Sequence, residues 1–380
     1  MMFLQKIHNP NRRYTEVCQQ VLHQIGKFCV NLRELDVSSC PVSDNGIMNL
    51  CIFLNEPTKR SRLVLLNVLS TAVTVKGAEI AIANCNDLRV LMFCDICEVL
   101  YRMYGSQEKQ KEFELSGEVP SLLLQNLIIQ QMTASLAPVA ASIEISCKIC
   151  PNITEVDFVR GVTDQGLVYL SSLEHLRRIK LANCEEQQIS FEAGVLPLLQ
   201  IRGATVEELS LCDINNIDLA CIGACCPNIR SLSCLVAGYA SCSFPLCTQP
   251  EVLNKSASSF TELRHLKLLL HCPQNSLPST CLKLLFRNSL ELETIGLDNI
   301  DVLDDDVMNE ILDGNPLLKA RSIKLKTCQH VTAAPLWRLL EYNELSHMDL
   351  SGCLQITRRD IDDFKRYCKT KCFNLKIIWS

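Results

Sequence analysis

Apolar and polar residues alternate along this chain in short stretches that return at a nearly constant interval. Residues 32–37 (Leu-Arg-Glu-Leu-Asp-Val) have apolar side chains at the first, fourth and sixth positions, with charged ones between them. Such alternation predicts a short β-strand with one buried face. A helix-start signal such as Val42-Ser43-Asp44 or Val162-Thr163-Asp164 follows, and then an amphipathic segment such as 165–174. The repeating unit is therefore expected to be a strand, a turn and a helix.

Cysteine marks two fixed positions of this unit. Four copies end in cysteine at the ninth position, at residues 32–40, 176–184, 320–328 and 345–353. Looser copies begin at Leu63, Leu88, Leu124, Ile153, Val206, Ile229, Leu263, Leu292 and Leu375. A second cysteine lies three residues before the first apolar position at Cys29, Cys85, Cys150, Cys226 and Cys372. Nine of the 23 cysteines thus share two positions, which chance would not produce.

The spacing of the units predicts the fold. The thirteen starts span 343 residues in twelve intervals, about 29 residues each, within the range of leucine-rich repeats. One such unit cannot bury its apolar faces alone, so neighbours must stack. We therefore predict an α/β fold, a right-handed leucine-rich-repeat solenoid (horseshoe) with a parallel concave sheet and outer helices. Residues 1–31 are expected to form an N-terminal helical cap, with a helix over 15–29. Residues 32–380 are expected to form about thirteen repeats, with loop insertions near 105–118 and 235–259.

The motifs also point to a family. The cysteine-ended strand, the Cys-Pro-Asn at Cys150 and Cys226, and the helix starts at 42–47 and 162–167 resemble the leucine-rich-repeat F-box proteins. They equally resemble relatives that carry these repeats without an F-box. The resemblance implies a protein-interaction scaffold, and more specifically a substrate-recognition or adaptor subunit of a cullin-type ubiquitin ligase. No Leu-Pro-containing box is evident before Leu32, where the F-box members bind the Skp adaptor. The alternative is a non-ligase regulator or inhibitor that binds a protein partner on its concave face.

A second ligase motif allows two interpretations. Residues 276–285 (Ser-Leu-Pro-Ser-Thr-Cys-Leu-Lys-Leu-Leu) match the short pattern by which some cullin substrate receptors bind Elongin C. The same stretch is also the expected helix of the repeat that begins at Leu263. We favour the helix, because such a match arises easily in a chain rich in leucine and cysteine.

Composition narrows the classes of partner and compartment. The net charge is −5 with a pI near 5.9, which gives no support for nucleic-acid or anionic-membrane binding. The N-terminus has no apolar signal-peptide core, and no stretch approaches the length that spans a bilayer. We expect reduced thiols that pack as small apolar groups, in the cytoplasm, the nucleus or both.

We expect no enzymatic chemistry. The sequence has no phosphate-binding glycine loop, HExxH or GxSxG motif. Two Cys-x-x-Cys pairs, Cys94/Cys97 and Cys147/Cys150, are separated by more residues than a four-cysteine zinc site usually spans. The prediction is therefore no catalytic residue, no metal site and no cofactor.

The third and fifth positions of each strand should face the open concave side, where a protein partner would bind. Early units carry acidic residues there and later units basic ones, which suits a partner of complementary charge, or simply keeps a solvated face soluble. Trp379 is either a binding anchor or a seal for the end of the array. The candidate partner-binding residues are Glu34, Asp36, Glu155, Asp157, Arg178, Lys180, His265, Lys267, Lys324, His347 and Trp379. The expected partner is a protein, such as a ubiquitylation substrate or a ligase adaptor, and neither nucleic acid nor a membrane.

Overall fold

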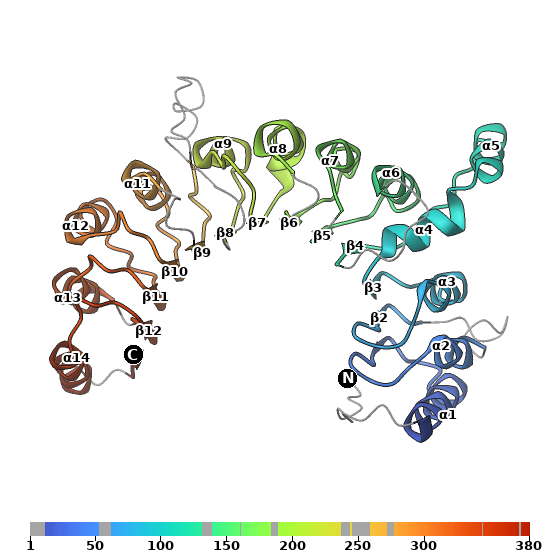
Figure 1. The fold of residues 1–380 in the computed structure, drawn as a ribbon, viewed down its shortest axis with the longest axis horizontal. Coiled ribbons are helices and arrows are strands. Elements are labelled where there is room, and N and C mark those ends of the chain that lie inside the picture. The colour runs from blue at the N-terminus through green and yellow to red at the C-terminus, as the bar shows by residue number, and fades with distance from the viewer. Residues whose placement is uncertain are drawn as a thin grey trace. The chain divides into compact units, whose positions relative to one another are not determined.

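A computed structural model of the chain describes residues 12–52, 62–130, 139–159, 161–183, 189–236, 244, 259–271, 277–343, 345–371 and 374–380. The chain divides into two compact units, residues 1–176 and 177–380. In each, short parallel strands lie along one side and helices along the other (Figure 1).

The first unit holds five strands and seven helices within its described residues. The strands are β1 (Glu34–Asp36), β2 (Leu65–Asn67), β3 (Val90–Met92), β4 (Asn126–Ile129) and β5 (Glu155–Phe158). The helices are α1 (Arg12–Phe28), α2 (Asp44–Cys51), α3 (Val75–Asn84), α4 (Ile96–Tyr104), α5 (Gln107–Ser116), α6 (Val139–Ile149) and α7 (Asp164–Leu170). Strands β1, β2 and β3 pair in parallel, as do β4 and β5. Between β3 and β4 the buried amide of Asn126 bonds both the N–H and the carbonyl of Leu91, at 3.2 and 3.0 Å, in place of a regular ladder.

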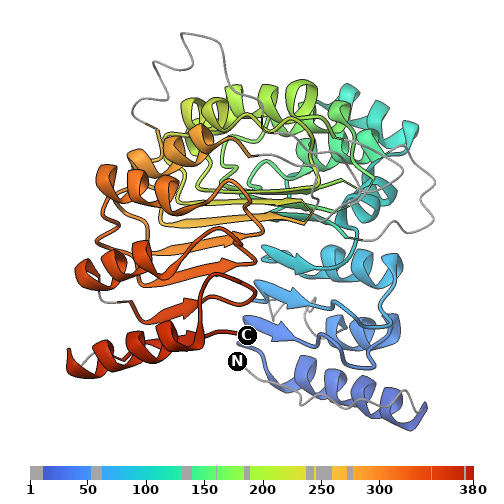
Figure 2. The ribbon, with the colours of Figure 1, turned by 60° about the vertical axis from the view of Figure 1, so that its left-hand side comes forward.

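The second unit holds eight parallel strands that lie side by side in sequence order. Figure 2 shows this part of the sheet from a second direction. They are β6 (Arg178–Ala182), β7 (Glu208–Cys212), β8 (Ser231–Val236), β9 (His265–Leu270), β10 (Thr294–Asp298), β11 (Ser322–Lys326), β12 (His347–Asp349) and β13 (Lys376–Ile378). The helices are a π-helical turn (Phe191–Val195), α8 (Leu196–Arg202), a 3-10 turn (Gly203–Thr205), α9 (Leu219–Cys225), α11 (Ser279–Arg287), α12 (Asp305–Gly314), α13 (Ala333–Tyr342) and α14 (Arg358–Thr370).

Equivalent repeat positions pair across neighbouring strands. We number the positions from the first apolar residue of each unit, so that Leu263 and Leu292 are both position 1. Position 3 of β9, His265, then pairs with position 3 of β10, Thr294, and the same correspondence holds for β6 to β7 and β10 to β11. Side chains at positions 4 and 6, such as Leu266 and Leu268, are buried against the helices. The chain is therefore an α/β solenoid of leucine-rich repeats, as its sequence period predicts.

The turn that follows six of the strands is a second repeated feature. Position 8 has a left-handed backbone at Ser39, Ser70, Asp213, Asn299, Thr327 and Gly352, with φ between 48° and 75°. In five of these six units position 9 then points a buried side chain back into the core, and in the sixth Thr71 is half-buried. At Cys353 the thiol donates to the carbonyl of Leu325 on the preceding repeat at 3.0 Å. A cysteine fits here because it is small, apolar and a weak donor. Cys184 and Cys372, two members of the predicted cysteine series, lie outside the described residues.

The N-terminal helix α1 packs against α2 but exposes part of its apolar face. Leu22 and Ile25 of α1 are buried, and a Cβ at Gly26 would overlap the carbonyl of Leu50, so glycine lets α1 approach α2 closely. Val17 and Phe28, in contrast, are 54% and 67% exposed.

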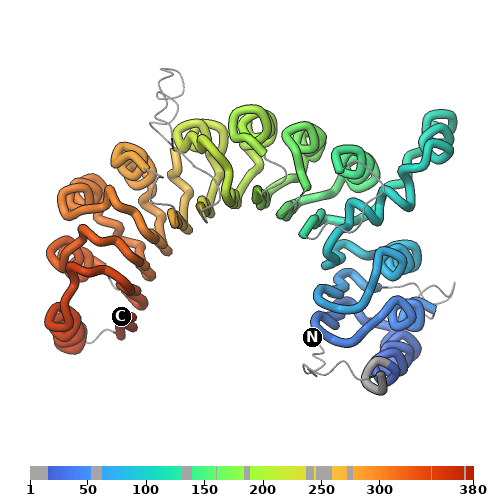
Figure 3. The backbone as a smooth tube through the Cα atoms, in the orientation of Figure 1, coloured from blue at the N-terminus to red at the C-terminus, as the bar shows by residue number. Residues whose placement is uncertain are grey.

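Two predicted insertions have different outcomes. The segment 105–118, expected to be a loop, contains helix α5, which begins after the Ser106 cap and ends at left-handed Gly117. None of its side chains is buried, and its backbone extends outward beyond α4 in Figure 3. Most of the second insertion, 235–259, lies outside the described residues.

Candidate protein-binding face

The strand face of the first unit carries the predicted acidic residues, but they are not equally available. Glu34 is exposed, whereas Asp36, Glu155 and Asp157 are half-buried. The Asp36 carboxylate accepts the Ser38 N–H at 2.9 Å. Burial raises the pKa of Asp36, but hydrogen bonds from Ser38 and Asn67 outweigh it and lower that pKa overall. Asp36 therefore fixes the end of its own strand, in addition to any contact it makes with a partner.

The strand face of the second unit is cationic. Positions 2, 3 and 5 of its eight strands carry nine lysines and arginines against four carboxylates, a net +5 where the whole chain is −5. The cations are Arg177, Arg178, Lys180, Arg230, Arg264, Lys267, Arg321, Lys324 and Lys376, and the carboxylates are Glu207, Glu208, Glu293 and Asp349. The sequence prediction included Arg178, Lys180, Lys267 and Lys324. It missed the arginines at position 2, although their recurrence before position 3 is a signal in the sequence.

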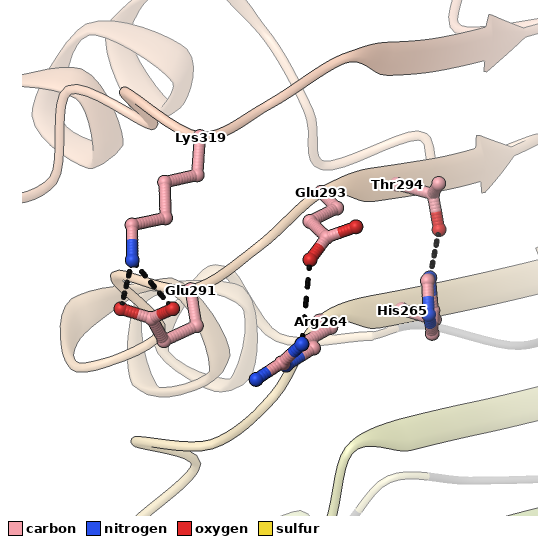
Figure 4. A network of polar contacts seen from close by, with 6 residues as sticks. All are labelled: Arg264, His265, Glu291, Glu293, Thr294 and Lys319. Carbon is pink, nitrogen blue, oxygen red and sulfur yellow. Dashed lines mark hydrogen bonds and ion pairs between the residues drawn. The ribbon is translucent and has the colours of Figure 1, made fainter.

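Polar contacts between adjacent repeats order part of this face (Figure 4). The His265 Nδ1 lies 2.8 Å from the Thr294 hydroxyl oxygen, and Arg264 lies 3.7 Å from Glu293. Lys319 bonds both oxygens of Glu291 at 2.5 and 2.6 Å. These pairs are solvent-exposed and stabilise the fold little. They link side chains at or just before the starts of β9, β10 and β11.

Neighbouring repeats bring three position-5 residues of this face together. Gly296 pairs with Lys267 on one side and with Lys324 on the other. Both lysines are exposed, as is His265, while His347 on β12 is half-buried. Asp349, next to His347, is buried and lies 3.3 Å from Lys326.

The last strand corrects the predicted register. The sequence pattern starting at Leu375 placed Ile377 and Trp379 at positions 3 and 5. In the structure Lys376 pairs with His347 and Ile378 with Asp349, so those two residues occupy positions 3 and 5. Trp379 follows the strand and its indole N–H donates to the Ile356 carbonyl at 3.1 Å, with the side chain 37% exposed. That bond and the ladder to β12 set the register.

Burial keeps several of the described cysteines in the protonated form. Burial raises the pKa of Cys147, Cys226, Cys234 and Cys328 to about 12, and that of Cys97 also lies well above its usual value. Such thiols stay protonated at neutral pH, and the thiolate is the form that binds metal or attacks. Cys97 and Cys147 lie near each other, yet no group of three ligands in the described part of the chain could hold a metal ion.

The stretch that matches the Elongin-binding pattern is part of the core. Its described residues enter α11, and Leu277, Cys281, Leu282 and Leu285 are all buried. The helix interpretation is therefore confirmed, and these side chains are not available to an Elongin-type partner. Among the described residues, no helix combines the length and apolarity needed to cross a bilayer.

Among known proteins, distant structural similarity to this chain was found. No protein-family model and no curated protein matches it. Similar solved structures include a leucine-rich-repeat protein of Leptospira interrogans, 12% identical over 93% of this chain and 91% of that chain, with a TM-score of 0.38. The Rad7 and Elc1 complex of yeast is 12% identical over 92% of this chain and 91% of that chain, with a TM-score of 0.36. The fold assignment rests on the strand register and the repeated turn.

Proposed function

We propose that this protein is an interaction scaffold whose cationic strand face in the second unit binds a protein partner. The observation that carries the proposal is the separation of charge: this face is net +5 in a chain that is net −5. Charge gathered on one face costs self-repulsion, and complementary charge on a partner speeds and directs association. The fold itself supports binding rather than catalysis, because each repeat presents two variable side chains on an open sheet.

We further propose that the partner is a substrate of a cullin-type ubiquitin ligase and that this chain is the recognition subunit. The support is the repeat motif shared with the leucine-rich-repeat F-box proteins. The alternative, a regulator that holds its partner without a ligase, uses the same face. Free thiols at all 18 described cysteines fit a reducing compartment, and we propose that the protein resides in the cytoplasm, the nucleus or both.

Co-purification of the tagged full-length protein from cells, followed by mass spectrometry, tests both the binding face and the ligase role. The variant carries Arg178→Glu and Lys180→Glu on β6. The matched control carries Lys365→Glu and Lys369→Glu, two exposed residues of α14 with the same change in charge. We expect the β6 variant to lose a partner that the control retains. Recovery of a cullin together with Skp or Elongin, by the wild type and by both variants, would support the ligase proposal.

Two other outcomes count against these proposals separately. Recovery of the same partners by the β6 variant would contradict binding on the cationic face. Recovery of a charge-dependent partner without any cullin, Skp or Elongin would refute the ligase role and leave the regulator.

A further inference from the structure

One point of the cationic face is built differently from the rest. Position 5 of β9, β10 and β11 reads Lys267, Gly296 and Lys324. Neighbouring strands lie about 4.8 Å apart, so the two lysine backbones are separated by about 10 Å with a glycine between them. Gly296 adds no side chain of its own at this point, and the nearest side-chain atom to the place of a Cβ is the Lys267 Cγ, at 3.6 Å.

The cations around this glycine have no anionic partner in the described chain. Lys267 and Lys324 are exposed and form no hydrogen bond or ion pair with another described residue. Arg321, at position 2 of β11, is likewise exposed with an unpaired guanidinium. In contrast, Arg264 and Arg177 at the same position pair with Glu293 and Glu207. Within the second unit, the other arginines at position 2 are thus paired with glutamates, whereas positive charge remains on both sides of Gly296.

Polar groups beside the glycine complete a surface that suits carboxylates. Thr294 and Ser322 lie at position 3 of β10 and β11, two residues before Gly296 and Lys324. The Nδ1 atom of His265 is engaged by Thr294 at 2.8 Å, which orients the ring. A lysine is a flexible point charge, so both ammonium groups are able to turn toward an anion placed over Gly296.

We propose that Lys267, Gly296 and Lys324 form an acid-binding subsite that takes the aspartate or glutamate carboxylates of an extended acidic protein segment. The inference rests on the proposed function, since the segment belongs to the protein partner. A nucleic acid fits less well, because Glu207, Glu208 and Glu293 interrupt the basic positions and would repel a continuous phosphate backbone.

Fluorescence anisotropy with the full-length protein tests the subsite. The probe is a labelled decapeptide of alternating glutamate and glycine; its glutamine counterpart and a labelled thymidine decanucleotide are run in parallel. We expect the glutamate peptide to bind, with affinity falling as salt rises, and the other two to bind at least tenfold more weakly. Lys267→Gln with Lys324→Gln should weaken glutamate-peptide binding at least tenfold, whereas Lys365→Gln with Lys369→Gln should leave it unchanged.

Gly296 provides a second and independent variant. A Cβ there would meet Lys267 Cγ at 3.6 Å, an ordinary contact, and its backbone is not left-handed, so substitution is compatible with the strand. Gly296→Glu places a carboxylate between the two lysines, where it competes with the ligand. We expect an unchanged melting temperature and circular dichroism spectrum, with at least a tenfold loss of glutamate-peptide binding. Gly296→Ala should bind within twofold of the wild type.

The outcomes separate this subsite from the broader function. Equal binding of the glutamate and glutamine peptides, or full binding by folded Gly296→Glu protein, overturns the subsite. Preference for the thymidine probe overturns it in favour of nucleic acid. Because the co-purification experiment uses Arg178 and Lys180 on β6, a partner lost there but insensitive to Lys267 and Lys324 would retain the scaffold and reject only the subsite.

Discussion

The aspartate at the start of a helix explains the helix-start motif of these repeats. Asp44, the first residue of α2, accepts the Thr74 backbone N–H at 2.7 Å and the Thr74 hydroxyl at 2.6 Å. Thr74 is the N-cap of α3, so the carboxylate joins one helix start to the next. Asp305 makes the same two bonds to Thr332, at 2.8 and 2.6 Å. The sequence predicts the cap, but the partner in the next repeat becomes visible only when the repeats are stacked.

The glycine of the neighbouring helix belongs to the same arrangement, which gives a first prediction. A Cβ at Gly77 would overlap the Asp44 carboxylate and crowd Val73. Gly77→Ala should therefore destabilise the protein by about 1–3 kcal/mol, and Asp44→Ala by about 1 kcal/mol. In the double variant the overlap with the carboxylate is absent and only the crowding of Val73 remains, so the cost of Gly77→Ala should fall by about 1 kcal/mol. Urea unfolding of all four proteins measures this, and strictly additive costs would contradict the contact.

The buried thiols make a second prediction, on pH. Burial raises the pKa of Cys234 from 9.0 to about 12 in the folded protein. Above pH 9 the unfolded state releases this proton while the folded state still holds it. The contribution of Cys234 to the free energy of unfolding is therefore fully present below pH 9 and is lost as pH rises toward 12. The loss is about 1.4 kcal/mol per pH unit for one such thiol.

Comparison with a variant that lacks only the Cys234 thiol isolates this effect from other groups that titrate in the same range. Cys234→Ala should be less stable than the wild type at pH 8 because of the cavity. Between pH 9 and pH 11 its unfolding free energy should decline less steeply than that of the wild type. Parallel declines would show that Cys234 ionises equally in both states. The sequence indicates that these cysteines are buried, but their pKa depends on the packing of the completed array.

Among the elements, the strands follow the sequence most closely. Twelve of the thirteen expected starts match the observed strands, because a slip of one residue would turn every apolar side chain outward. The last strand departs from this pattern because Leu375 and Ile378 satisfy the apolar spacing as well as Ile377 and Trp379 do, so the ladder to β12 decides. The apolar pattern does not predict helix α5, because this helix has no apolar stripe. Its Ser106 cap and helix-favouring composition are sufficient for its formation.

The exposed helix α5 and a buried strand give a matched pair of leucines for a third prediction. Leu115 of α5 is 89% exposed, whereas Leu181 of β6 is 2% exposed. Leu181→Ala should cost about 2–5 kcal/mol, and Leu115→Ala should stay within about 0.5 kcal/mol. Hydrogen exchange should also be faster in the amides of α5 than in those of α4, whose Val99 and Leu100 are fully buried. Strong protection of α5 would mean that something covers it in solution.

At the scale of the molecule, a solenoid is stable only through contacts between neighbouring repeats, so its ends are its weakest points. In the second unit, α14 packs against α13. Phe364 of α14 is fully buried, and its ring lies 4.6 Å from that of Trp337 on α13 in an edge-to-face arrangement. Tyr367 makes a second edge contact to Trp337 at 5.6 Å. These aromatic contacts hold α14 against the repeat before it.

Removing that contact should unfold the second unit from its C-terminal end. Phe364→Ala should cost about 3–5 kcal/mol through the lost ring and the cavity. Because coupling passes only between neighbours, the loss should appear first in the local transition around Trp337. The chain has only two tryptophans, so Trp379→Phe leaves Trp337 as the sole reporter. In that background, Phe364→Ala should red-shift the emission of Trp337 at a urea concentration where circular dichroism still shows most of the helices. Simultaneous loss of both signals would instead mean that this unit unfolds as one block and that α14 is not a separable cap.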